Sequence, residues 1–380
     1  MNFELSEEQE MVRETAKSFA QEVLAKNVDE RDEEERFPEE EIKQMGELGF
    51  MGIMVPEEYD GAGMDPVSYV VMLEEIAKVD ASSAVIVSVN NSLVCEVFLK
   101  YGSEEQKEKY LKPLAGGRQL GAFSLSEAGA GSDPGSLICS AKKVGDGYIL
   151  NGTKNFTTNG ASADVIIVFA TLDRNLGYKG ISAFIVEKGT PGFRVSKKER
   201  KMGIRSSDTC ELTFEDCRIP LDNLIGPEGK GLSIALSVLD GGRMGVAAQA
   251  VGIARASLEV ALNYAKERKQ FGKTLSEFSA IQSKLADMAT EIECARMMLY
   301  HAAFLRQIGK DYVQAAAMAK LKASQVAVWA SDEAVQILGG YGYLKDFPVE
   351  RYFRDAKITE LYEGTTEIQK LVIARKLLSE

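Results

Sequence analysis

The residues whose types and spacing could do chemistry gather near the C-terminal end, in the segment 361–369 with the sequence LYEGTTEIQ. Thr366 and Gln369 have the spacing of a helix capping box, and apolar residues then recur at helical intervals. Glu363 is therefore expected in the loop just before a helix, where Gly364 lets the backbone bend. A carboxylate placed there, beside the aromatic Tyr362, is a candidate general base. The alternative is that Glu363 is an ordinary solvated loop residue.

The scarcity of histidine strengthens the case for a carboxylate. The chain has one histidine, His301, inside an apolar run at 297–304, where a helix-packing role is expected. Acid–base chemistry must then rest mainly on a carboxylate, lysine, tyrosine or cysteine. Ser-His-Asp machinery is not expected, nor is a histidine-rich metal site, and no metal ligand is assigned.

The composition indicates a globular protein with a substantial core, since 45% of its 380 residues are hydrophobic. A net charge of −12 argues against nucleic acid and anionic membranes as partners, because both select a basic face. No apolar run of membrane-spanning length is seen, and the acidic start does not resemble a signal peptide. The five cysteines never have C-x-x-C spacing and indicate free thiols in a reducing compartment, so a cytoplasmic location is expected.

The predicted fold is mostly α with a central antiparallel β domain. Capping boxes at Ser6 and Ser103 indicate helices in an N-terminal domain, 1–117. Short apolar runs separated by Gly- and Asn-rich turns indicate a middle, β-barrel-like domain, 118–226. The remainder, 227–380, is expected to be a C-terminal helical bundle. Its long helices are predicted at about 231–268, 276–307 and 311–338.

Two glycine-rich segments could hold a ligand. The segment 126–133, SEAGAGSD, can present backbone N–H groups and serine hydroxyls to a phosphate, although a flexible turn is the alternative. The segment 336–343, QILGGYGY, follows a predicted helix and is also typical of a helix C-terminus. Neither G-x-G-x-x-G after a strand nor a P-loop motif is present.

Six motifs in a fixed order make the chain resemble the acyl-CoA dehydrogenases, over essentially its whole length. They are SEAGAGSD at 126–133, KNFTTNG at 154–160, LDGGR at 239–243, ERKQFG at 267–272, QILGGYG at 336–342 and LYEGT at 361–365. Among members the chain is most similar to the short-chain, butyryl-CoA-type enzymes. Two positions depart from the common pattern: Ala128 stands where proline is frequent, and Phe156 where tryptophan is frequent.

The resemblance implies the chemistry and the site. Glu363 would be the base that removes the α-proton of a short-chain acyl-CoA, while FAD takes the β-hydride to give the trans-2-enoyl-CoA. The implied FAD contacts within the subunit are Leu125, Ser126, Ser132, Phe156, Thr158, Thr365 and Glu367. The implied contacts to the FAD of a neighbouring subunit are Arg268, Phe271, Gln336 and Gly340. The implied substrate contacts are Ser132, Asp240, Arg243, Tyr362 and Gly364.

The same resemblance implies an electron-transfer flavoprotein as redox partner and a homo-oligomer, expected to be a tetramer built as a dimer of dimers. Membrane insertion and nucleic-acid binding are not expected. A second hypothesis keeps the fold but runs the reaction backwards, as an enoyl-CoA reductase within an electron-bifurcating complex. A third is a catalytically silent helical scaffold or acyl-CoA-binding module, against which the intact Glu363 argues.

Overall fold

The N-terminal part is helical, and its helices begin where the capping signals predicted. In the computed structural model, which describes residues 4–379, Ser6 Oγ accepts the Gln9 N–H at 3.2 Å and Gln9 Oε1 accepts the Ser6 N–H at 3.0 Å. Ser103 and Gln106 make the same reciprocal pair. The helices of this part are α1 (Glu7–Glu22), α2 (Val28–Glu34), α3 (Glu39–Glu47), α4 (Pro66–Ala77), α5 (Ala81–Ser88), α6 (Glu96–Tyr101), α7 (Glu104–Gln106) and α8 (Lys112–Ala115).

A π-helical segment, Val89–Cys95, joins α5 to α6, so the helical stretch Ala81–Tyr101 is continuous but locally widened. All of its residues are buried, and Leu93 and Val94 belong to the main hydrophobic core. Segments of this kind are frequent at functional sites because the extra residue redirects side chains. Here it brings Leu93 against α9 (Gly231–Glu267) close to Glu363.

The middle part is one sheet with the strand order β6-β7-β3-β2-β4-β5-β8, and β1 lies beside β4. The pairs are antiparallel as predicted, with two exceptions: β1 and β4 are parallel, and β2 touches β4 through a single parallel pair. A parallel pair needs a long connection, which the chain between β1 and β4 supplies. The strands are β1 (Gly121–Ser124), β2 (Ser140–Val144), β3 (Gly147–Thr158), β4 (Val165–Thr171), β5 (Ile181–Glu187), β6 (Phe193–Lys198), β7 (Thr209–Pro220) and β8 (Leu224–Ile225).

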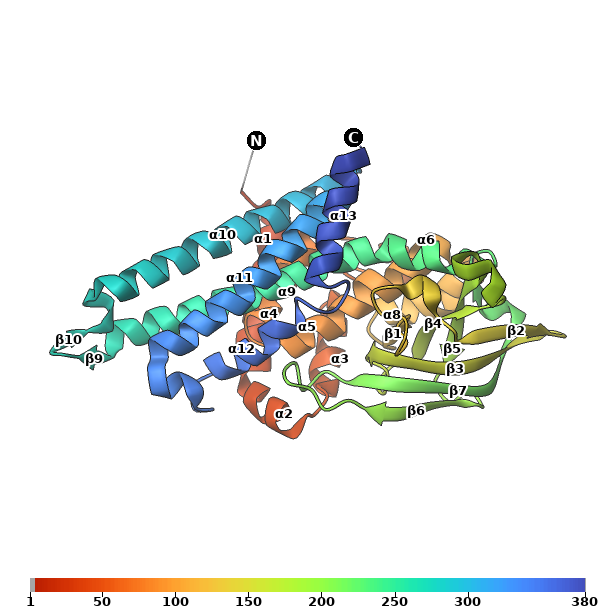
Figure 1. Ribbon diagram of the computed structural model, residues 1–380, viewed down its shortest axis with the longest axis horizontal. Helices are drawn as coiled ribbons and strands as arrows, with labels where there is room; N and C mark the ends of the chain where they lie inside the picture. The colour runs from red at the N-terminus through yellow and green to blue at the C-terminus, as the bar shows by residue number, and fades with distance from the viewer. Residues whose placement is uncertain (1–3, 380) are drawn as a thin grey trace.

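The C-terminal part consists of long helices that start and stop close to the predicted positions. They are α9 (Gly231–Glu267), α10 (Ser279–Gln307), α11 (Val313–Leu338), α12 (Val349–Ile358) and α13 (Thr366–Ser379). A small hairpin, β9 (Lys269–Gln270) and β10 (Lys273–Thr274), connects α9 to α10. Figure 1 shows this hairpin at one end of the molecule and the sheet at the other, with α9, α10 and α11 running lengthwise.

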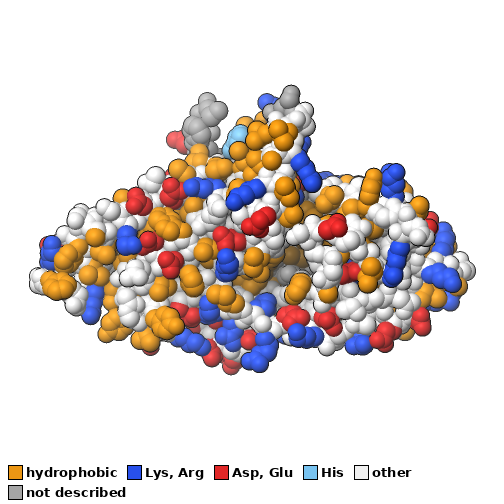
Figure 2. Space-filling model, in the orientation of Figure 1, with side chains coloured by type: hydrophobic (Ala, Val, Ile, Leu, Met, Phe, Trp, Pro, Cys, Tyr) orange, Lys and Arg blue, Asp and Glu red, His pale blue; other side chains and the backbone are white. Residues whose placement is uncertain are grey.

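The main core joins the two helical parts to one face of the sheet. Apolar residues of α4, α5, α9, β4 and β5 belong to the same buried cluster. A second, smaller cluster lies on the opposite face of the sheet. The helical and sheet regions meet around a hollow that is visible on the face in Figure 2. The division at residues 117 and 226 into three domains stays a prediction.

Two helical stretches correct the expectation that no apolar run reaches membrane-spanning length. The stretches Ala81–Tyr101 and Gly231–Glu267 are long and apolar enough to cross a membrane by length and composition alone. However, 94% and 72% of their most apolar windows are buried inside the protein. Packing around the core therefore accounts for their apolar character.

Candidate active site

Glu363 lies in the loop between α12 and α13, as predicted, with a left-handed backbone conformation. Its φ angle is 50° and that of Gly364 is 92°. The predicted cap one residue into the helix was wrong: α13 begins at Thr366, and Thr365 Oγ1 accepts the Ile368 N–H at 3.4 Å. The two adjacent threonines offer the same local chemistry, and the left-handed turn at 363–364 selects the earlier one.

The Glu363 side chain is directed onto α9, where glycine leaves room for it. A β-carbon added to Gly242 would lie 1.9 Å from Glu363 Oε2 and 3.1 Å from Leu93 Cδ2. Any larger residue at 242 would therefore collide with the carboxylate. Glu363 as a whole is half-buried, but its Oε2 is inaccessible and has no hydrogen-bond partner among the described residues. This arrangement argues against the alternative of a solvated loop residue.

Burial governs the protonation of this carboxylate. Loss of solvent raises the pKa of Glu363 from its usual 4.5 to about 7, while the positive charges of Lys320 and Arg243 act in the opposite direction. A carboxylate whose pKa is close to neutrality is matched to a general base, because it is ionised near pH 7 and still accepts a proton readily.

This shift predicts a pH-dependent stability change for Glu363→Gln. The folded-state pKa lies above the unfolded value, so ionised Glu363 destabilises the native state increasingly between pH 4.5 and about 7, and by a constant amount above that. The glutamine variant lacks this penalty. We expect it to match the parent near pH 4 and to be more stable by about 1–3 kcal/mol at pH 8, measured by denaturant unfolding. An equal difference at both pH values would contradict the assigned burial.

The loop is held by three side chains that sequence reasoning missed. Lys320 Nζ, from α11, donates to the Gly364 carbonyl at 2.7 Å. Gln369 Nε2 donates to the same carbonyl at 2.9 Å and to that of Glu363 at 3.2 Å. The Tyr362 hydroxyl donates to Gln249 Oε1, and Gln249 Nε2 donates to the Ala81 carbonyl at 2.7 Å. The sequence did contain an indication that Lys320 is buried. It lies at helical spacing from Ala316, Ala323 and Ala327, on an otherwise apolar face.

Three of the five predicted substrate residues, Arg243, Tyr362 and Gly364, lie in or close to this loop. Arg243 is buried on α9 and pairs with the half-buried Asp240, one turn earlier on the same helix. Burial raises the pKa of Asp240, and Arg243 opposes that change. Arg243 Nε is buried without a partner in the described chain, so the guanidinium retains a donor for a ligand. Tyr362 and Gly364 flank Glu363 directly, whereas Ser132 is exposed in the loop after β1.

Two buried polar side chains pack against α9 about one turn beyond Gly242. The Tyr69 hydroxyl lies 3.0 Å from Ser88 Oγ, and both residues are buried. A β-carbon on Gly245 would lie 2.2 Å from Ser88 Oγ and 2.6 Å from the Tyr69 hydroxyl. Burial, with a smaller contribution from Glu363, raises the pKa of Tyr69 to about 12, so its hydroxyl stays neutral.

The first group of predicted FAD residues lies on the sheet. Phe156 is 66% exposed and has a φ angle of 59° near the end of β3, while Thr158 is half-buried two residues later. Leu125 and Ser126 are half-buried directly after β1. Their loop is held by the buried Lys154, a residue of the KNFTTNG motif for which the sequence predicted no role.

Lys154 joins the two ends of that loop. Its Nζ donates to Glu127 Oε1 at 2.8 Å and to the Leu125 carbonyl at 3.0 Å. The Glu127 carboxylate in turn accepts the Ile138 and Cys139 N–H groups at 2.7 and 2.9 Å. A buried ion pair with its remaining lone pairs satisfied gives a defined geometry. Gly129 and Gly131 meet no atom within 4 Å of an added β-carbon, so their side of the loop is open.

The second group lies far from Glu363 within one subunit. Arg268 follows the end of α9, roughly 39 Å along the helix from Gly242, since an α-helix rises about 1.5 Å per residue. Arg268 and Gly340 line a concave site of about 550 Å³, where the guanidinium lies 5.4 Å from the ring centre of Tyr341. Gln336 is exposed on the last turn of α11 beside this site, and Phe271, in the hairpin, is 93% exposed.

The residues that would fit FAD form two separate groups. An exposed aromatic ring beside a partly buried threonine suits the flat isoalloxazine ring, and the open glycine loop suits a pyrophosphate. Arg268 beside glycine backbone suits a phosphate. The remaining two predicted contacts lie at the start of α13, close to Glu363 in sequence. Thr365 is half-buried and Glu367 is exposed. Within the described chain these groups do not come together, because the length of α9 separates Arg268 from Glu363.

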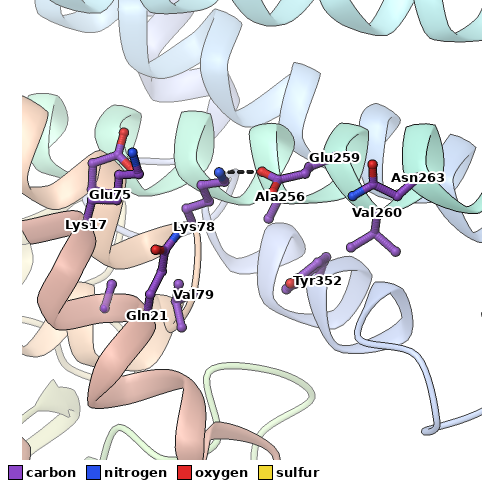
Figure 3. A pocket seen from close by; sticks show the side chains of 11 residues that line it. Lys17, Gln21, Glu75, Lys78, Val79, Ala256, Glu259, Val260, Asn263 and Tyr352 are labelled. Carbon is purple, nitrogen blue, oxygen red and sulfur yellow. Dashed lines mark ion pairs between the residues drawn. The ribbon is translucent and has the colours of Figure 1, made fainter. Parts of the chain in front are cut away.

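Another cavity of about 190 Å³ lies between α1, α4, α9 and α12 (Figure 3). Lys78 and Glu259 form an ion pair within its lining, and neither Glu363 nor any residue that contacts it lines the cavity. It is separate from the candidate site. His301 is exposed on α10. The expectation that this histidine packs inside a helical core was therefore wrong.

Three family models match the chain in succession. The N-terminal domain of acyl-CoA dehydrogenase matches residues 6–118, the middle domain residues 122–217 and the C-terminal domain residues 229–378.

Relatives of known activity and solved structures match over nearly the whole chain. A short-chain specific acyl-CoA dehydrogenase of Clostridium acetobutylicum is 51% identical over 99% of this chain and 100% of its own. An acryloyl-CoA reductase (NADH) of Anaerotignum propionicum is 47% identical over 100% and 96%. Butyryl-CoA dehydrogenase from Megasphaera elsdenii has a TM-score of 0.98 at 48% identity, covering 100% of both chains. A structure from work on the electron transferring flavoprotein of Acidaminococcus fermentans and flavin-based electron bifurcation has a TM-score of 0.99 at 52% identity, again over 100% of both.

Proposed function

Since the chain belongs to the acyl-CoA dehydrogenase family, we propose that it oxidises a short-chain acyl-CoA to the trans-2-enoyl-CoA with Glu363 as the base. Membership makes the protein a flavin oxidoreductase, and relatives imply FAD as its cofactor. The observation that carries the proposal for Glu363 is its inaccessible, unpartnered Oε2 atom, which lies against Gly242. A buried acceptor with no protein partner is suited to receive a proton from a ligand.

The α-proton of a saturated thioester is weakly acidic, so its removal needs a positioned base and stabilisation of the developing oxygen charge. Glu363 supplies the base, ionised near neutral pH. The Glu363 N–H, which makes no backbone hydrogen bond among the described residues, would donate to the thioester oxygen. Bound FAD supplies the acceptor for the hydride that leaves the β-carbon.

The proposed binding contacts are those that the family resemblance implies. Tyr362 and Gly364 would line the acyl group beside the base, and Asp240, Arg243 and Ser132 would contact the substrate. Leu125, Ser126, Ser132, Phe156, Thr158, Thr365 and Glu367 would hold FAD from one subunit. Arg268, Phe271, Gln336 and Gly340 would hold it from a second subunit, because the length of α9 separates them from Glu363. A homo-oligomer, expected to be a tetramer, is therefore part of the proposal, as is a cytoplasmic location.

We propose that an electron-transfer flavoprotein accepts the electrons. The close structural match from work on such a flavoprotein supports this partner. The direct test of the whole proposal is an anaerobic titration of the purified, yellow protein with a panel of acyl-CoAs, followed by flavin absorbance. Bleaching by short-chain acyl-CoA is the expected result. An intact flavin spectrum with every member of the panel would leave only a binding or scaffold role.

We expect the same titration to reveal a preference for acyl chains of about four carbons. Tyr69 and Ser88 pack against Gly245, about one turn along α9 from Gly242, and relatives include short-chain and butyryl-CoA enzymes. Each buried methylene contributes about 0.8 kcal/mol, so a deeper pocket would favour longer chains markedly. We expect a higher kcat/KM with butyryl-CoA than with octanoyl-CoA. The reverse order would show that the pocket extends past Tyr69.

The alternative is an enoyl-CoA reductase within an electron-bifurcating complex. It is favoured by the similarity to an acryloyl-CoA reductase and to a structure from work on electron bifurcation. The same base would then deliver the proton to the α-carbon, so the site residues keep their roles. Measuring which of crotonyl-CoA reduction and butyryl-CoA oxidation proceeds with the physiological flavoprotein decides the direction.

A further inference from the structure

Two buried side chains converge on the turn that carries Glu363. Lys320 Nζ donates to the Gly364 carbonyl at 2.7 Å, and Gln369 Nε2 donates to the same oxygen at 2.9 Å. Gln369 also reaches the Glu363 carbonyl, at 3.2 Å. Lys320 and Gln369 are both 0% exposed. They come from different helices, α11 and α13, so the turn is fixed by the relative position of those helices.

A lysine at this position is costly unless it has a function. Burying an ammonium group carries a desolvation penalty, and replacing a buried charge by an apolar residue of similar volume is often neutral or stabilising. Lys320 also lies among small apolar residues: Ala316, Ala319 and Ala323 on the same helix are all 0% exposed. Packing alone would be served equally well by methionine.

The charged and titratable groups around Glu363 come from four directions. Arg243 and Asp240 face it from α9, Lys320 from α11 and the neutral Tyr69 from α4. Tyr362, Glu360 and Glu367 belong to its own loop and to the start of α13. Lys320 and Arg243 are the cations that act on Glu363, and Arg243 is already paired with Asp240.

We infer that Lys320 and Gln369 are positioning residues that clamp the Gly364 carbonyl, and that the Lys320 charge also keeps the neighbouring Glu363 carboxylate ionised. The clamp holds the left-handed turn, in which φ is 50° at Glu363 and 92° at Gly364. Such a conformation persists only where surrounding contacts over-determine it. The inference rests on the proposed role of Glu363 as the base.

The kinetic test compares Lys320→Met with the parent in single-turnover flavin reduction by butyryl-CoA between pH 5.5 and 9. Without the nearby cation the midpoint of the rate profile should move up by about one pH unit, which lowers the rate about tenfold at pH 5.5, about fivefold at pH 7 and less at pH 9. Gln369→Leu should lower the rate at every pH without moving the midpoint, because it removes geometry and no charge. The matched control is Lys322→Met, which lies on the same helix but pairs with Glu291 at the surface.

A second measurement does not depend on turnover. A double-mutant cycle of unfolding with Lys320→Met and Glu363→Gln is run at pH 7.5, because burial lowers the pKa of Lys320 to about 8 and its ammonium is still mostly charged there. The cycle should show coupling, because Glu363→Gln gains more stability once the cation is absent. If no acyl-CoA bleaches the parent protein, the proposed function fails while this cycle still tests the contact. An unshifted pH profile together with zero coupling would overturn the inference. So would failure of both Lys320→Met and Lys320→Gln to fold with FAD, since Lys320 would then be a structural residue.

Discussion

Glu363→Gln is expected to lower the rate of flavin reduction by a short-chain acyl-CoA about 100-fold or more. The substitution keeps the size of the side chain, so it still fits against Gly242, but it removes the proton acceptor. FAD should remain bound, because Phe156, Arg268 and the glycine loop are unchanged. Acyl-CoA should also bind, since the backbone N–H groups of the loop remain. Anaerobic stopped-flow bleaching of the flavin in a single turnover measures the rate.

The matched control is Glu360→Gln, three residues earlier in the same loop. Glu360 pairs with Lys357 at 2.5 Å on the surface, and its backbone contact with Thr366 does not involve the side chain. This variant should bleach at nearly the parent rate. If Glu363→Gln bleaches normally, or if Glu360→Gln loses as much activity, then the base is misassigned.

Arg268→Ala is expected to weaken FAD retention by about tenfold or more, because a charge-assisted hydrogen bond to a phosphate contributes about 1.5–3 kcal/mol. The flavin content after extensive dialysis, with the oligomeric state from light scattering, measures the effect. Arg218→Ala is the control, since Arg218 is an exposed arginine that pairs with Asp146 on the sheet. A monomer that retains a full complement of FAD would contradict a site shared between subunits.

Mixing two variants that are each impaired at low FAD concentration tests the shared site directly. Suppose Arg268 of one subunit completes the site that contains Glu363 of another. A mixed oligomer of Arg268→Ala and Glu363→Gln subunits then contains some sites in which both residues are intact. After the subunits exchange, part of the activity should return at low FAD concentration. If Arg268 serves its own subunit, every site in the mixture lacks one residue and no activity returns.

The capping boxes at Ser6 and Ser103 and the ends of the long helices could be predicted because their causes are local. A hydroxyl that satisfies an N–H three residues away, and an alanine-rich run between breakers, are complete within a few turns of chain. The position of Glu363 ahead of a helix was predictable for the same reason. The parallel pairing of β1 with β4 was not, because it depends on how distant strands come together in the sheet.

The roles around Glu363 show the limit of local information. The order of the motifs identified the family and singled out Glu363, Arg243 and Arg268 as chemically important residues. That Lys320 would hold the Gly364 carbonyl, or that Gly242 would make room for the carboxylate, could not be read from spacing, since each partner comes from a different helix. The raised pKa of Glu363 has the same origin: it arises from the exclusion of water by α9 and α11, and solvent exclusion is a property of packed helices rather than of any segment of the chain.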